Sequence, residues 1–186
     1  MRNIAVTGSF ASGKSYVINC LDELGYKVFS CDDYVRELYQ RSDIQQLVVQ
    51  ELKDLNNFDK AKLAEIVYSN ESERKKLEKI IHPLVREGIK NFEQQHENES
   101  LLFTEVPLLF ETNFNRFFAK VICVFCSEET RLARANSRRN GSLNVFEKIK
   151  KIQFSQEVKK AKADYTIDSE KEVRQQLLVI IDKLKV

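Results

Sequence analysis

The sequence predicts an α/β fold, with a five-stranded parallel sheet flanked by helices. Five short apolar runs, near residues 4–7, 26–29, 101–104, 120–125 and 164–168, alternate with segments of helical spacing. Short buried strands that alternate with helices are typical of parallel sheets covered on both faces. The first run also leads into a pattern of the form GxxxxGK[ST] at residues 8–15, and such a loop joins a strand to a helix.

The loop after the first strand has the residues of a phosphate-binding site. It reads Gly8, Ser9, Phe10, Ala11, Ser12, Gly13, Lys14 and Ser15, with Tyr16 next. The two glycines allow a backbone curl that turns successive N–H groups into one anion-sized hollow at a helix N-terminus. Lys14 is suited to the β- and γ-phosphates of a nucleotide, and Ser15 to Mg²⁺. The alternative is a glycine-rich turn with a solvent-exposed lysine.

The next elements follow from apolar spacing and helix breakers. A helix over roughly 14–24 ends at Gly25, and Ser30 to Asp33 supply cap candidates after the second strand. Residues 34–95 contain no strand-like run, and their spacing predicts helices at 34–40, 44–55, 59–68 and from about 71 onward.

Breakers and caps divide that helical stretch and the second half of the chain. Asp43 and Asp59 stand where caps are expected, and His82-Pro83 is expected to interrupt the long segment. Helices are then predicted at about 127–138, beginning at Ser127, at about 145–160 and at about 170–184, with a turn at 139–142.

Length and composition limit the classes of protein to which the chain can belong. The chain has 186 residues, enough for one domain, and its 30 basic and 28 acidic side chains give a net charge of +2. That balance does not indicate a dedicated nucleic-acid binder. No apolar run approaches the length of a membrane span. The N-terminus enters the first strand directly, so we expect no signal peptide and a cytoplasmic protein.

The four cysteines are expected to be buried and reduced. Cys123 and Cys126 have the spacing of a metal or redox pair, but they lie along a predicted strand, where positions three apart face opposite ways. Cys20 and Cys31 are the other two, and no second ligand pair lies near Cys123 and Cys126 in the sequence. A reducing cytoplasm fits this use of cysteine.

Acidic residues follow two of the predicted strands, at the edge that the phosphate-binding loop shares. Asp32 could take a proton from an attacking hydroxyl or hold Mg²⁺ through water, or it could cap a helix, as Asp33 also could. Arg36, one turn on, could meet an acidic substrate or pair with Asp32. Glu105 suits either a Mg²⁺-directed acid or a surface residue.

Four arginines cluster near the predicted turn at 139–142: Arg131, Arg134, Arg138 and Arg139. The first three share one helical face, and arginines that close over a moving phosphoryl group can stabilise its charge. The alternative is a solvated basic face. His82 is expected to pack or cap, and Lys159 to be solvated in its lysine-rich helix unless a family resemblance indicates otherwise.

At this point the motifs match a known family, the dephospho-CoA kinases, which the chain resembles over essentially its whole length. The family's TGGxGSGKS is matched from Thr7 to Ser15, its short Asp-x-Asp turn by Ser30, Cys31 and Asp32 with Arg36, and its HPxV by residues 82–85. Its PLLFE is matched by residues 107–111, and its Q…K…ADYVIDN by Gln153, Lys159 and residues 163–169.

The resemblance implies a P-loop NTPase fold in three parts. They are a core of about 1–33, 100–126 and 163–186, a helical acceptor-binding insert of about 34–95 and a lid of about 127–160. It also implies ATP-dependent phosphorylation of the ribose 3′-hydroxyl of dephospho-CoA, the last step of coenzyme A biosynthesis, with Mg²⁺.

The same resemblance implies roles for the matched residues. Asp32 faces the hydroxyl, and Lys14, Arg134 and Arg138 act on the phosphoryl group. Residues 8–16 hold ATP, with Ser15 on the metal, and Arg36 and His82 border the acceptor. Asp168 lies near the adenine. Partners are small molecules only, without nucleic acid or membrane, and a monomer is expected.

The chain departs from the family pattern at a few positions. Ser9 and Ala11 replace glycines, Tyr16 replaces a threonine, Ser30 replaces the first acid of the Asp-x-Asp turn, and Ser169 replaces an asparagine. Another small-molecule or nucleoside kinase on the same core is the main alternative function. A GTPase switch would need a guanine-reading NKxD motif, and the sequence contains no Asn-Lys dipeptide.

Overall fold

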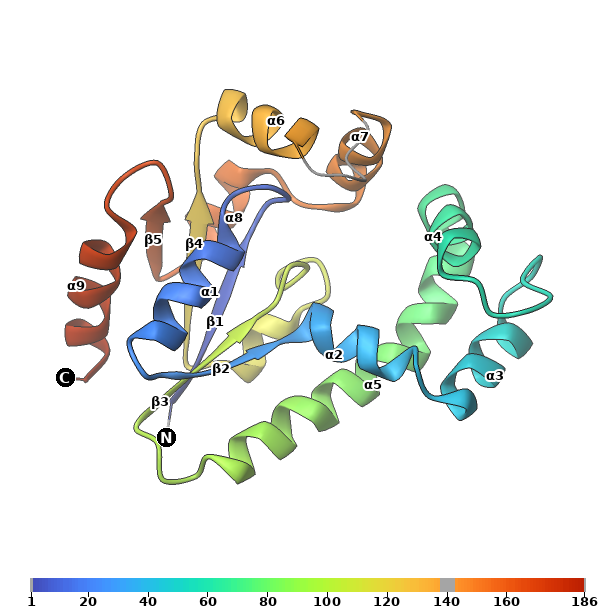
Figure 1. Ribbon diagram of the computed structural model, residues 1–186, viewed down its shortest axis with the longest axis horizontal. Helices are drawn as coiled ribbons and strands as arrows, with labels where there is room; N and C mark the ends of the chain where they lie inside the picture. The colour runs from blue at the N-terminus through green and yellow to red at the C-terminus, as the bar shows by residue number, and fades with distance from the viewer. Residues whose placement is uncertain (1, 138–142, 186) are drawn as a thin grey trace. The chain divides into compact units, whose positions relative to one another are not determined.

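The computed structural model describes residues 2–137 and 143–185. The chain forms two compact units, one of Met1–Ser30 with Glu93–Val186 and one of Cys31–Phe92. The first unit holds the whole sheet, and the second is helical (Figure 1).

The sheet of the first unit has five strands in the order β2-β3-β1-β4-β5. Every neighbouring pair is parallel, which confirms the predicted fold class. The strands are β1 (Arg2–Gly8), β2 (Lys27–Ser30), β3 (Leu101–Glu105), β4 (Lys120–Phe125) and β5 (Tyr165–Asp168). They lie within a residue or so of the predicted runs, apart from the earlier start of β1, because short buried apolar runs are the strongest local strand signal.

The strand register brings the carboxyl ends of the strands to one edge. Glu105 at the end of β3 is in register with Val6 of β1 and with Ser30, the last residue of β2. Gly8 pairs with Val124, and Phe125 with Asp168 at the end of β5. The loop that begins at Gly8 therefore leaves the sheet beside the ends of β4 and β3.

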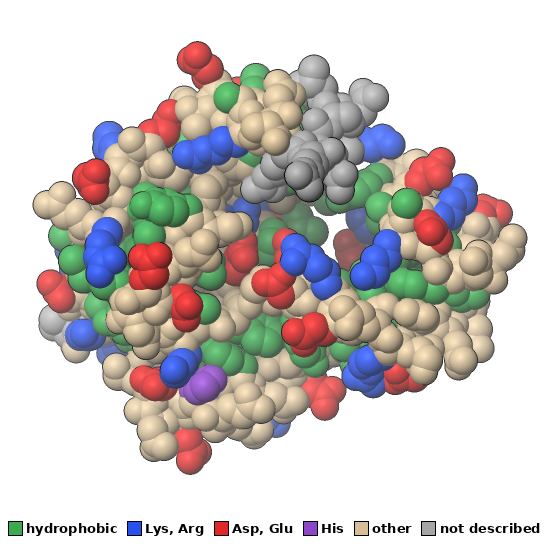
Figure 2. Space-filling view, in the orientation of Figure 1, with side chains coloured by type: hydrophobic (Ala, Val, Ile, Leu, Met, Phe, Trp, Pro, Cys, Tyr) green, Lys and Arg blue, Asp and Glu red, His purple; other side chains and the backbone are tan. Residues whose placement is uncertain are grey.

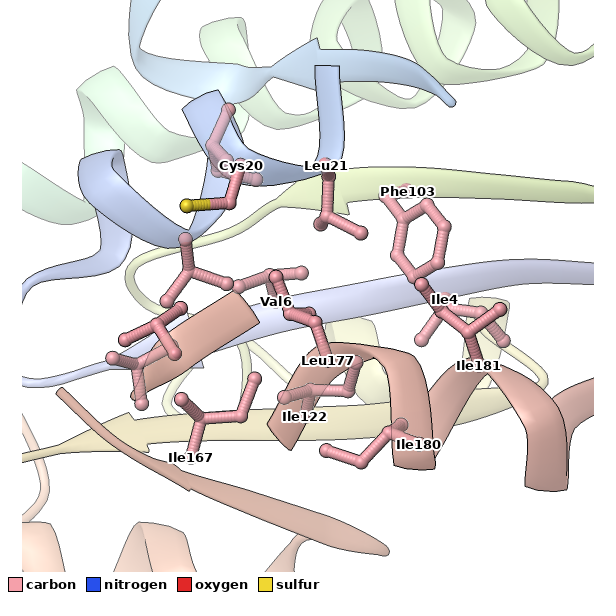
Figure 3. Packing of buried hydrophobic residues seen from close by; sticks show 14 of the residues in the cluster. Ile4, Val6, Cys20, Leu21, Phe103, Ile122, Ile167, Leu177, Ile180 and Ile181 are labelled. Carbon is pink, nitrogen blue, oxygen red and sulfur yellow. The ribbon is translucent and has the colours of Figure 1, made fainter. Parts of the chain in front are cut away.

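One face of the sheet is covered by α1 (Lys14–Glu23) and α9 (Val173–Lys185). Figure 3 shows Cys20 and Leu21 of α1, Leu177, Ile180 and Ile181 of α9, and strand residues such as Phe103 and Ile122 in one cluster. Leu21, Phe103 and Leu177 are completely buried. Burial of a Leu or Phe side chain contributes about 1.5–3 kcal/mol, so this cluster is the main core of the unit.

The opposite face packs against α8 (Gln156–Lys162), which contacts β1 and β4. Cys123 and Cys126 are both buried, as predicted, and burial raises the pKa of the Cys123 thiol to about 11. Asn3 is also buried here; it accepts a hydrogen bond from Thr104 Oγ1 at 3.0 Å and donates one to Glu93 at 2.8 Å.

The second unit consists of α2 (Cys31–Leu38), α3 (Ser42–Glu51), α4 (Lys60–Ser69) and α5, which spans Glu71–Gln95 and ends in the first unit. Gly88 of α5 lets the ring of Tyr34 approach, since an added Cβ would lie 2.5 Å from that ring. Asp59 caps α4 as predicted, accepting from the Lys62 N–H at 2.7 Å. The prediction that Asp43 is a cap is wrong, because it lies inside α3 and pairs with Arg41.

Three other boundary predictions need correction. α5 runs through Pro83 without a break, because Pro83 is on the exposed side and Ile81, Val85 and Ile89 keep the helix packed. The single helix predicted at 145–160 is two helices, α7 (Leu143–Ile152) and α8, because the Ser155 hydroxyl caps α8. α9 begins at Val173 rather than near 170.

The remaining helices are η1 (Phe114–Phe117) and α6 (Glu128–Ser137). Ser127, where a helix was predicted to begin, caps α6, because its hydroxyl accepts from the Thr130 N–H at 3.2 Å. The predicted turn at 139–142 lies outside the described residues. On the face drawn in Figure 2, acidic and basic side chains are interspersed. Among the described residues, no helix is long and apolar enough to span a membrane.

Candidate active site

The loop from Gly8 to Ser15 joins β1 to α1, as its pattern predicts. Gly8 lies so close to β4 that an added Cβ would be 2.3 Å from the carbonyl oxygen of Val124. Gly13, at the N-cap of α1, has φ +96, and its Cβ would be 2.8 Å from Ser169 Oγ. Both positions need glycine for this curl of the backbone.

Ala11 keeps the loop's conformation although the residue is not glycine. Its φ of +62 is left-handed, which costs an L-residue roughly 1–2 kcal/mol. Its methyl group is buried in a small cluster with Ala135 and Phe146, and burial of one such carbon returns about 0.8 kcal/mol. The replacement of the family's glycine is therefore compatible with the loop.

Lys14 lies over the loop and is only 8% exposed, so the alternative of a solvent-exposed lysine is wrong. Its ammonium donates to the carbonyls of Gly8 at 3.0 Å and Ser9 at 3.2 Å. Ser15 and Tyr16 are exposed in the first turn of α1. The Tyr16 N–H donates to the Gly13 carbonyl at 3.1 Å, whereas the N–H groups at the very start of a helix have no acceptor within it. A cation and helix-terminal donors thus meet at one place.

Three buried hydroxyls lie in or beside the loop without a hydrogen-bond partner among the described residues. They belong to Thr7, Ser9 and Ser12. A buried polar group without a partner costs free energy, and such groups are often satisfied by a ligand. Donors of this kind suit the oxygens of a phosphate chain.

Arg134 reaches the loop that follows β5. Its Nη1 donates to Ser169 Oγ at 2.9 Å, and Ser169 Oγ donates to the Ser12 carbonyl at 2.7 Å. The serine that replaces the family's asparagine therefore bridges Arg134 to the phosphate-binding loop. Arg138 and Arg139 lie outside the described residues.

Arg131 was predicted to be either solvated or directed at a phosphate, and the structure shows neither. It is buried, its Nε donates to the Phe10 carbonyl at 3.1 Å, and its Nη1 pairs with Glu128 at 2.7 Å. The sequence placed Arg131 and Arg134 on one helical face, whereas the structure binds them to different loops. Long-range contacts of this kind cannot be seen in helical spacing.

Lys159 is completely buried, so the prediction that it is solvated is wrong. Its ammonium pairs with Glu111 at 2.9 Å and donates to the Pro107 carbonyl at 2.6 Å. Burial lowers the pKa of Lys159, while the Glu111 carboxylate acts in the opposite direction. The family motifs that contain these residues were the one signal in the sequence that could have indicated this pairing.

The predicted acids differ in their surroundings. Glu105 is buried, contrary to the surface alternative, and accepts from Ser30 Oγ at 3.3 Å. Asp32 and Asp33 both lie in the first turn of α2, in the helical unit. Arg36 pairs with Asp33. Because Asp32 and Asp33 lie inside α2, neither stands at its N-cap. A carboxylate in a helix's first turn is still stabilised by the helix dipole.

His82 lies in a basic groove on α5 of the helical unit. Lys75, Glu78, Lys79, Pro83 and Arg86 line the rest of this groove, whose volume is about 400 Å³. Burial lowers the pKa of His82; the Glu78 charge acts in the opposite direction, and the Arg86 charge lowers the pKa further. Cations that outnumber the single acid make the groove suited to anionic groups.

Glu170 is a structural residue that no sequence pattern indicated. It follows β5 and accepts from the Ser127 N–H at 2.6 Å, from Ser127 Oγ at 2.8 Å and from the Thr130 hydroxyl. It therefore ties the N-terminus of α6 to the loop that carries Ser169. No local motif distinguishes it from other exposed glutamates.

Glu170→Gln is expected to lower thermal stability in a pH-dependent way. The hydrogen bond from Thr130, and then those from Ser127, hold the pKa of Glu170 below its ordinary value. A carboxylate whose pKa is lower in the folded than in the unfolded protein adds to the free energy of unfolding. This contribution is complete above the pKa in the unfolded chain, about 4.3 for glutamate, and is lost as the pH falls through the pKa in the folded protein. At pH 7 wild type should have a higher melting temperature than Glu170→Gln, and the difference between the two melting temperatures should disappear below pH 4.

The control for this measurement is Glu172→Gln, an exposed glutamate two positions away. Its melting temperature should follow that of wild type across the pH range. A Glu170→Gln protein that melts together with wild type at pH 7 would contradict the role given to this carboxylate.

Comparison with known proteins decides the family. A family model described as dephospho-CoA kinase matches residues 2–175. The chain belongs to the dephospho-CoA kinase family. Members of this family catalyse the ATP-dependent phosphorylation of dephospho-CoA to CoA. The resemblance stated from the sequence motifs is confirmed.

Individual dephospho-CoA kinases are similar over nearly the whole chain. The one from Rickettsia bellii is 42% identical over 91% of this chain and 88% of its own length. The one from Rickettsia felis is 39% identical over 99% of this chain and its full length.

Solved structures agree with the fold. TT1252 from Thermus thermophilus has a TM-score of 0.84 at 26% identity and covers 98% of this chain and 97% of its own. The dephospho-CoA kinase from Campylobacter jejuni has a TM-score of 0.66 at 29% identity, with coverage of 98% and 96%. A shikimate kinase from Acinetobacter baumannii, at 14% identity and a TM-score of 0.57, shares the fold alone.

Proposed function

We propose that this enzyme transfers the γ-phosphoryl group of ATP to the ribose 3′-hydroxyl of dephospho-CoA, with Mg²⁺ and with Asp32 as the residue that receives the hydroxyl proton. The observation that carries the proposal is the loop at residues 8–15. There Lys14, two glycines that leave no room for a Cβ and the first turn of α1 meet. Phosphoryl transfer requires mainly alignment and neutralisation of charge, and this loop can supply both.

The nucleotide side of the reaction uses residues 8–16. The N–H groups that open α1 and the buried hydroxyls of Ser9 and Ser12 suit the phosphate oxygens. The Lys14 ammonium can exchange its carbonyl acceptors for the β- and γ-phosphates. Asp168 and Ser169, at the end of β5, are proposed to border the adenine.

The metal would be held by Ser15, whose exposed hydroxyl stands in the first turn of α1. Glu105, a buried acid at the same edge of the sheet, would bind it through water. An oxygen donor set of this kind fits Mg²⁺, which keeps several of its waters. When bound, the ion supplies charge neutralisation between the phosphates.

The acceptor side uses the helical unit. Asp32 is the second residue of α2, which begins directly after the end of β2, and its carboxylate is proposed to take the proton as the 3′-oxygen attacks. Arg36 and the basic groove around His82 are proposed to bind the acidic parts of the acceptor. Arg134, with Arg138, is proposed to stabilise charge on the transferred group.

An assay of ADP release with dephospho-CoA, with and without Mg²⁺, tests the function. ADP is expected only when both are present, and the product should carry its new phosphate on the ribose 3′-oxygen. A panel of nucleosides and nucleotides serves as the comparison. Phosphorylation of one of these, with dephospho-CoA left unchanged, would replace the proposed acceptor.

We also propose that the enzyme acts as a monomer on small molecules in a reducing cytoplasm. All four cysteines are buried free thiols, which supports the reducing compartment. Sedimentation of the purified protein at assay concentration tests the oligomeric state.

A further inference from the structure

The residue Phe10, at the tip of the phosphate-binding loop, has both of its backbone groups bound by side chains from outside the loop. Its N–H donates to Gln153 Oε1 at 2.8 Å, and its carbonyl accepts from Arg131 Nε at 3.1 Å. Gln153 follows α7, and Arg131 belongs to α6. These helices lie beyond the carboxyl ends of β1 and β4 in Figure 1.

These two bonds set the orientation of two peptide planes. Because a trans peptide directs its C=O and N–H in opposite directions, the bond from the Phe10 N–H to Gln153 turns the Ser9 carbonyl the other way. The Ser9 carbonyl accepts from Lys14 Nζ at 3.2 Å and from the Ser12 N–H at 3.1 Å. In the same way, the bond from Arg131 to the Phe10 carbonyl fixes the direction of the Ala11 N–H.

Arg131 is itself held in place. It is 6% exposed, pairs with Glu128 at 2.7 Å, and its guanidinium lies 5.3 Å from the centre of the Phe146 ring. The second oxygen of Glu128 accepts from Lys150 of α7 at 3.0 Å. An arginine with this many fixed partners presents its Nε in one direction.

Gln153 is anchored through its neighbour in the chain. Glu111 Oε1 accepts from the Phe154 N–H at 2.7 Å and also pairs with buried Lys159 at 2.9 Å. Gln156 makes two further bonds to the backbone of Cys126, at 3.2 and 2.7 Å. The segment between α7 and α8 is thus fixed at Phe154 and Gln156, directly after Gln153, to the stretches of chain that follow β3 and β4.

We propose that Gln153 and Arg131 are positioning residues that hold the phosphate-binding loop in its ATP-binding conformation through Phe10, with the Lys159–Glu111 ion pair keeping Gln153 within reach. This inference rests on the proposed binding of ATP to residues 8–16. It gives a role to the Gln153, Lys159 and Glu111 positions, which phosphoryl transfer itself does not use. Neither Gln153 nor Arg131 needs to touch the substrate.

Gln153→Leu tests the proposal, since leucine keeps similar bulk and removes the acceptor for the Phe10 N–H. We expect the Kd for ATP, measured by calorimetry well below the melting temperature, to rise about tenfold, the size of one lost hydrogen bond. The KM for ATP should rise with it, while the KM for dephospho-CoA stays unchanged. Gln153→Glu, which keeps an acceptor oxygen, should stay within about threefold of wild type.

The matched control is Gln175→Leu, at an exposed glutamine on α9. It should bind ATP as wild type does. If Gln153→Leu is too unstable to assay, Gln153→Met, which is unbranched like glutamine, removes the same acceptor.

The inference would be overturned if wild type is active and the folded Gln153→Leu or Gln153→Met variant binds ATP with unchanged affinity. It would also be overturned if Gln153→Leu and Gln153→Glu lose affinity for ATP equally. Wild type that fails to bind ATP would instead overturn the proposed function and this inference together.

Discussion

Lys14→Met is expected to lower kcat/KM about a thousandfold, the typical effect of removing one group that stabilises charge in the transition state. Lys14 is the cation that lies over the loop, bound to the carbonyls of Gly8 and Ser9. Methionine retains the packing of the buried stem and removes the charge together with its two hydrogen bonds. The fold should therefore survive, because the core cluster around β1 does not include Lys14.

Turnover by the ADP-release assay, together with the melting temperature, checks this prediction. Lys27→Met, at an exposed lysine that begins β2, is the matched control and should keep wild-type turnover. Activity of Lys14→Met within tenfold of wild type, in folded protein, would show that the ammonium does not act on the transferred group.

Asp32→Asn is expected to lower kcat by roughly 10²- to 10⁴-fold, the usual contribution of a positioned general base. Asparagine has nearly the same shape but cannot take the hydroxyl proton. The Kd for ATP should remain that of wild type, because Asp32 lies outside the loop that is proposed to bind the nucleotide. This combination separates a catalytic role from a purely structural one in the first turn of α2, which would not require a proton acceptor.

Asp33→Asn is the control, since it is the next residue in the same first turn of α2 and pairs with Arg36. It should retain most of the turnover. If Asp32→Asn and Asp33→Asn reduce kcat equally, or if neither reduces it, Asp32 is not the base and another proton acceptor must be sought.

The local elements were predicted well because their signals are local. Each strand is a short apolar run, and the loop that begins at Gly8 is defined by eight consecutive residues. Asp59 was identified as a cap and Ser127 as the start of a helix, because capping joins residues only three positions apart. The interruption predicted at Pro83 failed because packing of the long α5 compensates for one lost backbone bond.

The side-chain assignments that failed depend on distant contacts. Lys159 looked like one of several lysines on a helix, yet its partner Glu111 is 48 positions earlier (159 − 111). Arg131 looked like one of a row of arginines, yet it binds a carbonyl 121 positions away. Spacing along one helix cannot distinguish a solvated cation from one that is buried and bonded to a distant loop.

The sequence by itself determined the alternation of strands and helices, the phosphate-binding loop and, through its motifs, the dephospho-CoA kinase family. Only the tertiary structure decided which side chains support that loop. Gln153 and Phe10 are 143 positions apart, and Ser169 and Ser12 are 157 apart. Such pairs meet because parallel strands bring their carboxyl ends to one edge of the sheet, and no short stretch of sequence encodes which of the residues gathered there will bind one another.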